Sequence, residues 1–132
     1  MVALHAGAGA RETRRGGDRV RGRECALAWI VLVVAGLFEV VWAFAMKLSE
    51  GFTRVWPSVV TGVAMTASVV LLAYSMRTLP LGTAYTVWTG IGAVGAFLVG
   101  IVVLGEPVSP MRVGAAVLIV TGLVMMKLSG AE

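Results

Sequence analysis

The amino-acid sequence predicts an all-α membrane protein with four transmembrane helices. Of the 132 residues, 58% are hydrophobic and only 14% are charged, whereas soluble domains carry about 25% charged residues. After the first 26 residues, the chain consists of four apolar segments of about 16–24 residues, separated by short polar loops. About 20 apolar residues in a helix cross the hydrocarbon core of a bilayer. Each segment can therefore span a membrane, and no loop is long enough to fold as a soluble domain.

Residues 1–26 differ in composition from the rest of the chain. They contain six arginines and three acidic residues but no apolar periodicity, which is typical of disorder. The other 106 residues hold five basic and four acidic residues, so the net charge of +4 comes mainly from this extension. Aromatic residues do not interleave with the arginines as they do in a nucleic-acid-binding surface. We divide the chain into a disordered extension, or a mis-assigned start, at 1–26 and a four-helix membrane domain at 27–130.

Proline and glycine residues limit the four predicted helices. Pro57 lies at the start of the second helix, where its missing N–H is harmless, and Pro80 and Pro110 precede the third and fourth. Gly105-Glu106-Pro107 ends the third helix. The four spans are expected at Leu27–Met46, Trp56–Met76, Leu81–Leu104 and Val113–Leu128.

The basic residues of the four-helix domain are almost balanced between the two sides of the membrane. The side of the N-terminus carries Arg77 and Lys127, and the opposite side carries Lys47, Arg54 and Arg112. By the positive-inside rule, such a domain inserts in both orientations, and two oppositely oriented copies can pair. The six arginines of the extension change the count to eight against three, which fixes the N-terminus inside. The sequence supports both interpretations.

The first span contains the candidate binding residue, because Glu39 lies in the middle of its apolar run. A charged side chain at the centre of a membrane helix costs about 2.5–3.5 kcal/mol on insertion scales, so it indicates a functional site. Gly36, Glu39 and Trp42 recur every three residues and share one helix face. Together they provide space, a charge and an aromatic ring for a cation. The alternative is a structural carboxylate hydrogen-bonded to a neighbouring helix.

The third span carries two aromatic residues and three glycines on or near one stripe. We expect Tyr85 and Trp88 to line the same cation pathway as Glu39, although Tyr85 also suits the interfacial aromatic belt. Gly90, Gly92 and Gly95 weaken the helix and allow a kink, so we expect a conformational hinge there. Close helix packing is the alternative explanation for these glycines.

The second and fourth spans supply further candidates. Ser68 lies mid-span, and periodicity alone favours a hydrogen bond from its hydroxyl to the carbonyl four residues earlier over one to Glu39. On the fourth span, small residues favour close packing with another helix. The expected dimer interface consists of Gly114, Leu118, Ile119 and Gly122.

The sequence predicts neither an enzyme nor a protein that needs a cofactor or metal. Cys25 is the only cysteine, which excludes an internal disulfide and a cysteine-based metal site. No nucleophile–base pair or phosphate-binding loop is recognisable.

From about Ala26 to Gly130 the chain resembles the small multidrug resistance transporters, which are four-helix proteins of bacterial membranes. Trp42, three residues after the acid, and Ser68 make it most similar to the guanidinium exporter branch, since exporters of bulky quaternary ammonium drugs usually have a small residue in place of Trp42. The matching segments are Gly36–Ala43, Met46–Ser49, Pro80–Gly92, Gly105-Glu106 and the stripe from Gly114 to Gly122.

The resemblance implies a proton-coupled antiporter that works as an antiparallel homodimer in the bacterial cytoplasmic (inner) membrane. Both copies of Glu39 would face one central site, lined also by Gly36, Trp42, Ser68, Tyr85 and Trp88. It also raises the expectation that Ser68 bonds to Glu39. The arginine-rich extension departs from the family and opposes dual insertion, so a heterodimer of two subunits with fixed orientations is the alternative assembly.

The expected function is export of guanidinium and small guanidinyl cations in exchange for protons, with Glu39 binding each in turn. Guanidinium is planar, and its N–H donors match a carboxylate. The expected partners are this cation, protons, membrane lipid and a second subunit, and no nucleic acid. Two alternatives stay open: a multidrug exporter of lipophilic quaternary ammonium cations, and one subunit of a paired heterodimer that is inactive alone.

Overall fold

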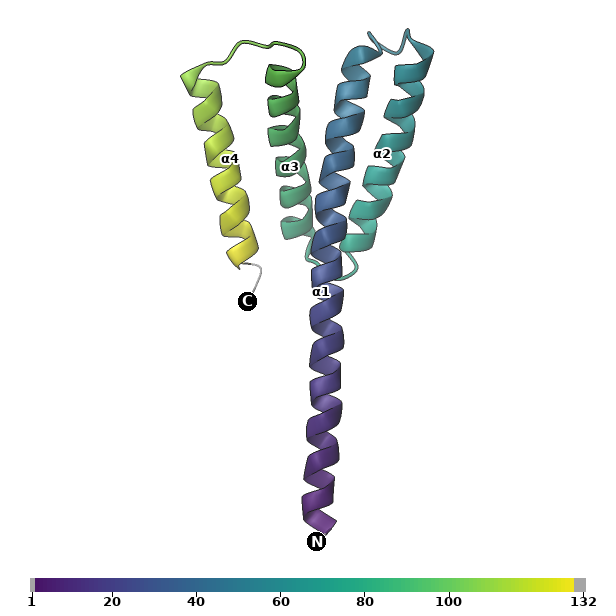
Figure 1. Ribbon diagram of the computed structural model, residues 1–132, viewed down its shortest axis with the longest axis vertical. Helices are drawn as coiled ribbons and strands as arrows, with labels where there is room; N and C mark the ends of the chain where they lie inside the picture. Colours follow the sequence, from purple (N-terminus) through teal and green to yellow (C-terminus); the bar gives the residue numbers. More distant parts are fainter. Residues whose placement is uncertain (1, 130–132) are drawn as a thin grey trace.

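The computed structural model describes residues 2–129 as four helices joined by short loops. The helices run alternately up and down, and each is long and apolar enough to cross a membrane (Figure 1). The prediction of an all-α, four-span membrane protein is confirmed, with boundaries that shift by a few residues. The helices are α1 (Val2–Leu48), α2 (Val55–Ser75), α3 (Leu81–Val102) and α4 (Pro110–Ser129).

The four helices lie roughly in a row in the order α4, α3, α1, α2, as Figure 1 shows. Helix α1 packs along α2 and α3, whereas α4 contacts α3 alone. Helix α1 is one of the two inner members of the row and packs against both α2 and α3. Glu39 lies on this inner helix.

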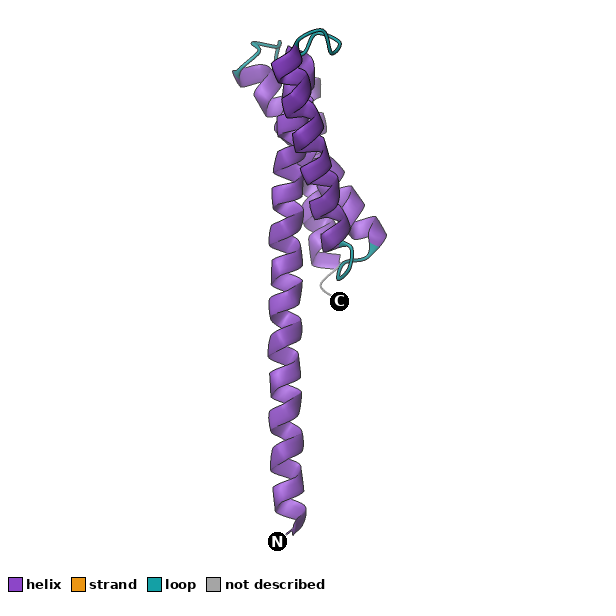
Figure 2. Cartoon of the chain, turned by 90° about the vertical axis from the view of Figure 1, so that its right-hand side faces the viewer, coloured by secondary structure: helices purple, strands orange, loops and turns teal. Residues whose placement is uncertain are grey.

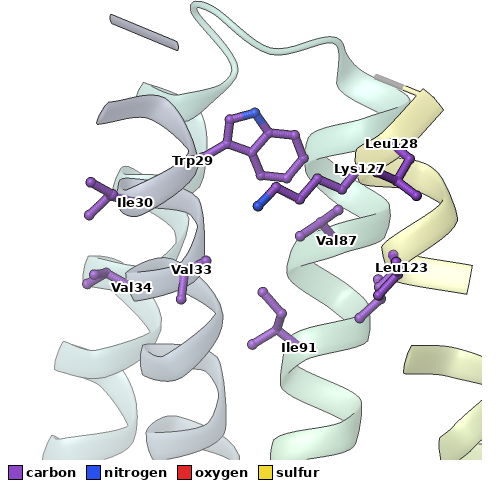
Figure 3. A pocket seen from close by; sticks show the side chains of 10 residues that line it. Trp29, Ile30, Val33, Val34, Val87, Ile91, Leu123, Lys127 and Leu128 are labelled. Carbon is purple, nitrogen blue, oxygen red and sulfur yellow. The ribbon is translucent and has the colours of Figure 1, made fainter. Parts of the chain in front are cut away.

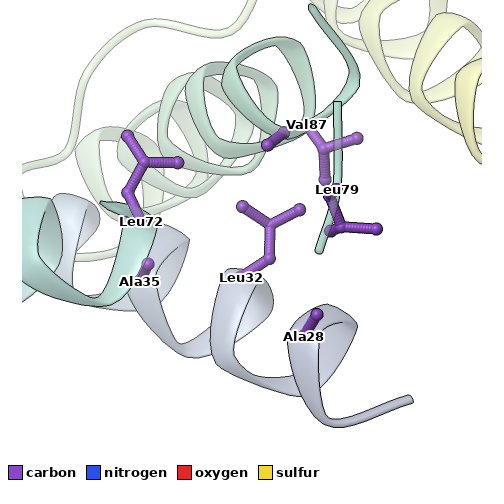
Figure 4. Close-up of a cluster of buried hydrophobic side chains, with 7 residues drawn as sticks. Ala28, Leu32, Ala35, Leu72, Leu79 and Val87 are labelled. Atoms are coloured by element: carbon purple, nitrogen blue, oxygen red, sulfur yellow. The ribbon is translucent and has the colours of Figure 1, made fainter. Parts of the chain in front are cut away.

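The core is small and lies between α1, α2 and α3 (Figure 4). Leu32 is fully buried, and two alanines of α1 let the neighbouring helices approach closely. Lipid chains are as apolar as leucine, so close packing rather than the hydrophobic effect holds membrane helices together. The buried apolar residues of this cluster are Ala28, Leu32, Ala35, Leu72, Leu79, Ala84 and Val87.

The turn between α1 and α2 is closed by Ser49, which is fully buried. Its hydroxyl donates to the Met46 carbonyl at 2.6 Å and accepts from the Phe52 N–H at 3.1 Å. Glu50, Gly51 and Phe52 all have positive φ angles, of 50°, 75° and 66°. Three left-handed residues in succession reverse the chain, and the Ser49 hydroxyl satisfies backbone groups at the end of α1 that would otherwise lack partners.

The structure differs from the expectation for the extension, because α1 continues through residues 2–26 without a break. These residues run straight out beyond the bundle (Figures 1 and 2), and the side chains of residues 13–27 are exposed. Starting a helix is its costly step, and the membrane span already provides a nucleus. Alanine, arginine and glutamate then favour continuation. Among residues 13–129, whose burial the structure describes, the first buried side chain is Ala28.

The contact between α1 and α3 depends on Gly36. A Cβ atom placed there would lie 2.6 Å from Ile91 Cγ2 and 2.9 Å from Ile91 Cβ. The backbone of α3 fixes the position of the Ile91 Cβ, and branching at this atom places Cγ2 against the new methyl group as well. One missing side chain on α1 therefore sets the distance between the two helices.

We expect Gly36→Ala to destabilise the protein by about 1–3 kcal/mol, as is usual for overpacking. Gly62→Ala is the matched control, because nothing lies within 4 Å of a Cβ at this α2 position. That control is expected to keep or raise stability, since alanine favours helix. The measurement is thermal unfolding of the detergent-solubilised chain by circular dichroism. Equal unfolding temperatures for the two variants would contradict the close contact.

Candidate functional site

Glu39 lies in the membrane-spanning part of α1 with its carboxylate turned toward α3. A Cβ atom on Gly92 would collide with the Glu39 carboxyl group, so the carboxylate lies directly against the backbone of α3. Its Oε2 atom is buried and has no hydrogen-bond partner. Gly92 thus provides the space that the acid occupies, a role distinct from the predicted hinge.

Trp42 provides a second buried polar atom without a partner. Its Nε1 and Glu39 Oε2 are the buried side-chain N and O atoms that lack a hydrogen bond within the described residues. Trp42 follows Glu39 by three residues, so both lie on one side of α1. Leaving a buried polar group unpaired costs about 1–3 kcal/mol. An unpaired donor and an unpaired acceptor on one side of a helix are typical of a site that a ligand or another subunit completes.

Ser68 joins three helices, and both expectations for its hydrogen bond were wrong. Its hydroxyl donates to the Ala35 carbonyl of α1 at 2.7 Å, not to its own helix and not to Glu39. It also accepts from Trp88 Nε1 of α3 at 3.0 Å. The hydroxyl proton is committed to a backbone carbonyl, so it is not available to the Glu39 carboxylate. Ala35 lies one helical turn before Glu39, and Ser68 therefore positions the turn that carries the acid.

The two aromatic residues of α3 contact each other. The ring centroids of Tyr85 and Trp88 lie 5.6 Å apart at an interplanar angle of 48°, a favourable tilted arrangement. Trp88 is half-buried and held by Ser68, whereas 53% of the Tyr85 side chain is exposed. Tyr85 precedes Gly92 by about two helical turns, roughly 10 Å along the axis. Within one chain, Trp88 is therefore hydrogen-bonded to Ser68, whereas Tyr85 lies on an exposed part of α3.

The α3 glycines make close contacts on two sides of a continuous helix. Gly90 faces Leu123 of α4, at 2.5 Å from a Cβ placed on the glycine. Gly95 faces Val40 of α1, next to Glu39. The alternative of close packing therefore describes these glycines in this conformation, and their role as a hinge stays a prediction.

The predicted dimer interface on α4 is open. A Cβ atom on Gly114 or Gly122 would meet nothing within 4 Å, and Leu118 is 73% exposed. No described residue of α4 is buried. Leu118, Ile119 and Gly122 line one side of an apolar cleft between α3 and α4. The exposed face of α4 leaves room for a second subunit, and the dimer interface stays a prediction.

Comparison with known proteins identifies the family. The family model "Small Multidrug Resistance protein" matches residues 27–121. The chain belongs to the small multidrug resistance family. It is 57% identical over 103 residues to proteins named guanidinium exporter from Escherichia coli (strain K12) and Shigella flexneri, and 56% identical to one from Salmonella typhimurium. Each alignment covers 78% of this chain and 98% of the relative.

The family match covers only part of the chain. The family match begins at residue 27, so the arginine-rich extension lies outside it. Four candidate spans and bacterial relatives identify a small multidrug resistance protein that crosses the inner membrane several times. Within the described residues, no group of three His, Cys, Asp or Glu side chains is placed to hold a metal ion.

Sequence reasoning missed two features of the site. Ala35 supplies the acceptor for Ser68 through its backbone, which no side-chain pattern reveals. Gly92 was noticed as a glycine, but a single sequence does not show which side chain fills the space beside it. The recurrence of small residues at Ala28, Ala35 and Gly36 on α1 was the available signal for a close helix contact.

We expect Ser68→Ala to lower stability by about 1–3 kcal/mol, because it leaves the Trp88 N–H without its acceptor and releases the Ala35 carbonyl. Thr66→Val is the matched control, since the Thr66 hydroxyl only donates to Gly62 of its own helix at 2.8 Å. Chemical unfolding in detergent, followed by tryptophan fluorescence, measures both. An equal loss of stability in the two variants would contradict the conclusion that the hydrogen bonds of Ser68 to α1 and α3 stabilise the bundle.

Proposed function

We propose that this protein is a proton-coupled antiporter that exports guanidinium and small guanidinyl cations, with Glu39 binding proton and cation in turn. The observation that carries the proposal is the unpartnered, buried Glu39 Oε2 on a membrane-spanning helix that packs against two others. The high identity to relatives named guanidinium exporter supports the substrate class.

The carboxylate itself supports the exchange. An unpaired charge within a membrane is costly, and either a proton or a bound cation removes that cost. One carboxylate cannot satisfy both fully, so the two compete for Glu39. Competition at one site, opened alternately to the two sides of the membrane, moves protons in one direction and the cation in the other.

The neighbouring groups favour a small planar cation. Guanidinium offers N–H donors and no acceptor, and it forms paired hydrogen bonds with a carboxylate. The Trp42 ring provides an aromatic face on the same side of α1, which suits a flat cation. The Trp42 N–H is itself a donor, so in the complete site it would pair with a carboxylate oxygen and not with guanidinium.

A second subunit is part of the proposal. A single chain arranges its helices in a row, and the exposed face of α4 has no partner within the described residues. Two chains in opposite orientations would enclose a pathway and place two Glu39 carboxylates in it. The balanced basic residues of the four-helix domain favour a homodimer. The exposed arginines of the extension favour fixed insertion, and hence a different partner chain.

We expect Glu39→Gln to abolish proton-driven guanidinium uptake into proteoliposomes, because glutamine is neutral and exchanges no proton. Glu50→Gln is the control: this acid lies in the α1–α2 turn, is 65% exposed and pairs with Arg54 at 3.4 Å. Its uptake should match the unaltered protein. Coupled uptake that survives Glu39→Gln would disprove the mechanism.

The main alternative is export of lipophilic quaternary ammonium cations on the same fold, which the exposed apolar surface would allow. We expect the unaltered protein to transport guanidinium in preference to a quaternary ammonium dye, and Trp42→Ala to shift this preference toward the dye by removing the bulky ring. Parallel uptake assays of the two cations measure it. A preference for the dye in the unaltered protein would favour the multidrug function.

The remaining alternative is a subunit that does not transport alone. It is favoured by the extension, whose arginines would hold every copy in one orientation. Proteoliposomes that contain only this chain separate the cases, since detergent purification and reconstitution insert proteins in both orientations. Guanidinium uptake by this preparation would exclude an inactive subunit.

A further inference from the structure

A cleft of about 650 Å³ opens between α1 and α4, on the side of the bundle where the C-terminus lies (Figure 3). Its volume is within the roughly 300–1,000 Å³ of small-molecule sites. Apolar side chains from three helices line it, including Val33 of α1, Ile91 of α3 and Leu123 of α4. The cleft exists because α4 packs on α3 alone and stands away from α1.

One charged residue lines the cleft. Lys127, in the last turn of α4, reaches across the opening so that its Nζ lies 5.5 Å from the centre of the Trp29 ring (Figure 3). Tryptophan and lysine are typical of the level where lipid headgroups meet the hydrocarbon core. The two side chains therefore mark the headgroup end of the cleft, and Val33, Ile91 and Leu123 lie deeper along it.

The chemistry of the cleft excludes the proposed substrate and fits an anionic amphiphile. An ammonium group at the opening repels guanidinium and attracts an anion. The apolar interior accepts hydrocarbon but offers little to a free anion. The occupant should therefore carry a negative headgroup on a long apolar chain.

The exposed charges at this end are mostly basic, although Glu24 lines a separate pocket with Arg77 between α1 and α2. Arg21 and Arg23 lie on α1 within two to three helical turns of Trp29, and their side chains are exposed. Arg77 lies in the α2–α3 loop at the same end of the bundle. Basic residues beside a membrane attract anionic lipids, by about 1 kcal/mol each, and basic pockets between spans bind anionic headgroups.

We propose that this cleft binds one anionic phospholipid, with an acyl chain between α1 and α4 and the headgroup phosphate beside Lys127. This binding site is separate from Glu39, which faces Gly92 on the contact between α1 and α3. The bound lipid fills the space that single-sided packing of α4 leaves open. It does not depend on the proposed transport function.

The test uses the full chain in a nonionic detergent with a trace of phosphatidylglycerol that carries a photoreactive diazirine in one acyl chain. Phosphatidylcholine with the same chains is the comparison lipid. After illumination, mass spectrometry of peptides measures labelling of the segments 29–34 and 123–128. We expect about fivefold more labelling by phosphatidylglycerol, as for one basic residue near an anionic headgroup.

Two pairs of variants locate the site. Lys127→Gln should remove the preference for phosphatidylglycerol, whereas Arg112→Gln, at the opposite end of α4, should keep it, and Lys127→Arg should restore it. Val124→Trp should fill the cleft and lower labelling by both lipids. Val117→Trp is its control, because Val117 is similarly exposed, at 58% against 54%, but lies outside the cleft.

Equal labelling by the two lipids in the unaltered protein would overturn the proposal. An unchanged preference in Lys127→Gln would do the same, and this surface substitution leaves the helix packing intact. Cross-links from segment 123–128 to a second copy of the chain, in place of lipid, would mean that a subunit occupies the cleft. Failure of guanidinium transport would leave these results unaffected, so the two proposals fail independently.

Discussion

The lack of water in the bilayer core is the constraint on which this structure depends. Every polar group within the spans needs a partner from the protein, because an unpaired group in hydrocarbon is costly. The Ser68 hydroxyl meets this requirement for three helices at once, accepting from Trp88 and donating to the Ala35 carbonyl. Against this background, the unpaired Glu39 Oε2 and Trp42 Nε1 are exceptions, and they lie on the same side of the same helix. Within the described residues, the other buried side-chain polar atoms are paired, and the two unpaired atoms belong to the site that we propose for proton and cation.

Small residues make the close approach possible. Ala35 lets α2 come near enough for the Ser68 bond, Gly36 accommodates Ile91, and Gly92 accommodates the Glu39 carboxylate. Since lipid chains compete equally well for apolar side chains, these contacts and the Ser68 bond must hold the bundle together. Helix α4 lacks comparable contacts except at Gly90 and remains exposed. Close contacts at small residues therefore explain why α1, α2 and α3 pack tightly around the site. Their scarcity on α4 explains the open cleft beside that helix.

Much of the fold follows from the sequence alone, because each membrane span is a continuous run of about 20 mostly apolar residues. The four apolar segments predicted four helices. Glu39 was recognisable as a candidate because it is a charged residue in the middle of an apolar segment. The partner of Ser68 did not follow, since it is a backbone carbonyl and any residue at position 35 has one. The role of Gly92 did not follow either, because a missing side chain gives no sign of what replaces it. Helical structure in residues 2–26 was missed because composition describes an isolated segment, whereas this one continues from a formed helix.

The continuity of α1 gives the extension a mechanical consequence. Glu39 and the arginines belong to one helix, so any tilt of α1 that accompanies opening of the site also swings the segment outside the membrane. At about 1.5 Å per residue, 25 residues form an arm of roughly 37 Å, and a tilt of about 10° displaces its end by roughly 6 Å. A relative without this arm moves nothing comparable through the surrounding water. In this chain, a tilt of α1 during the proposed transport would therefore also move the charges of the extension at a distance from the bilayer.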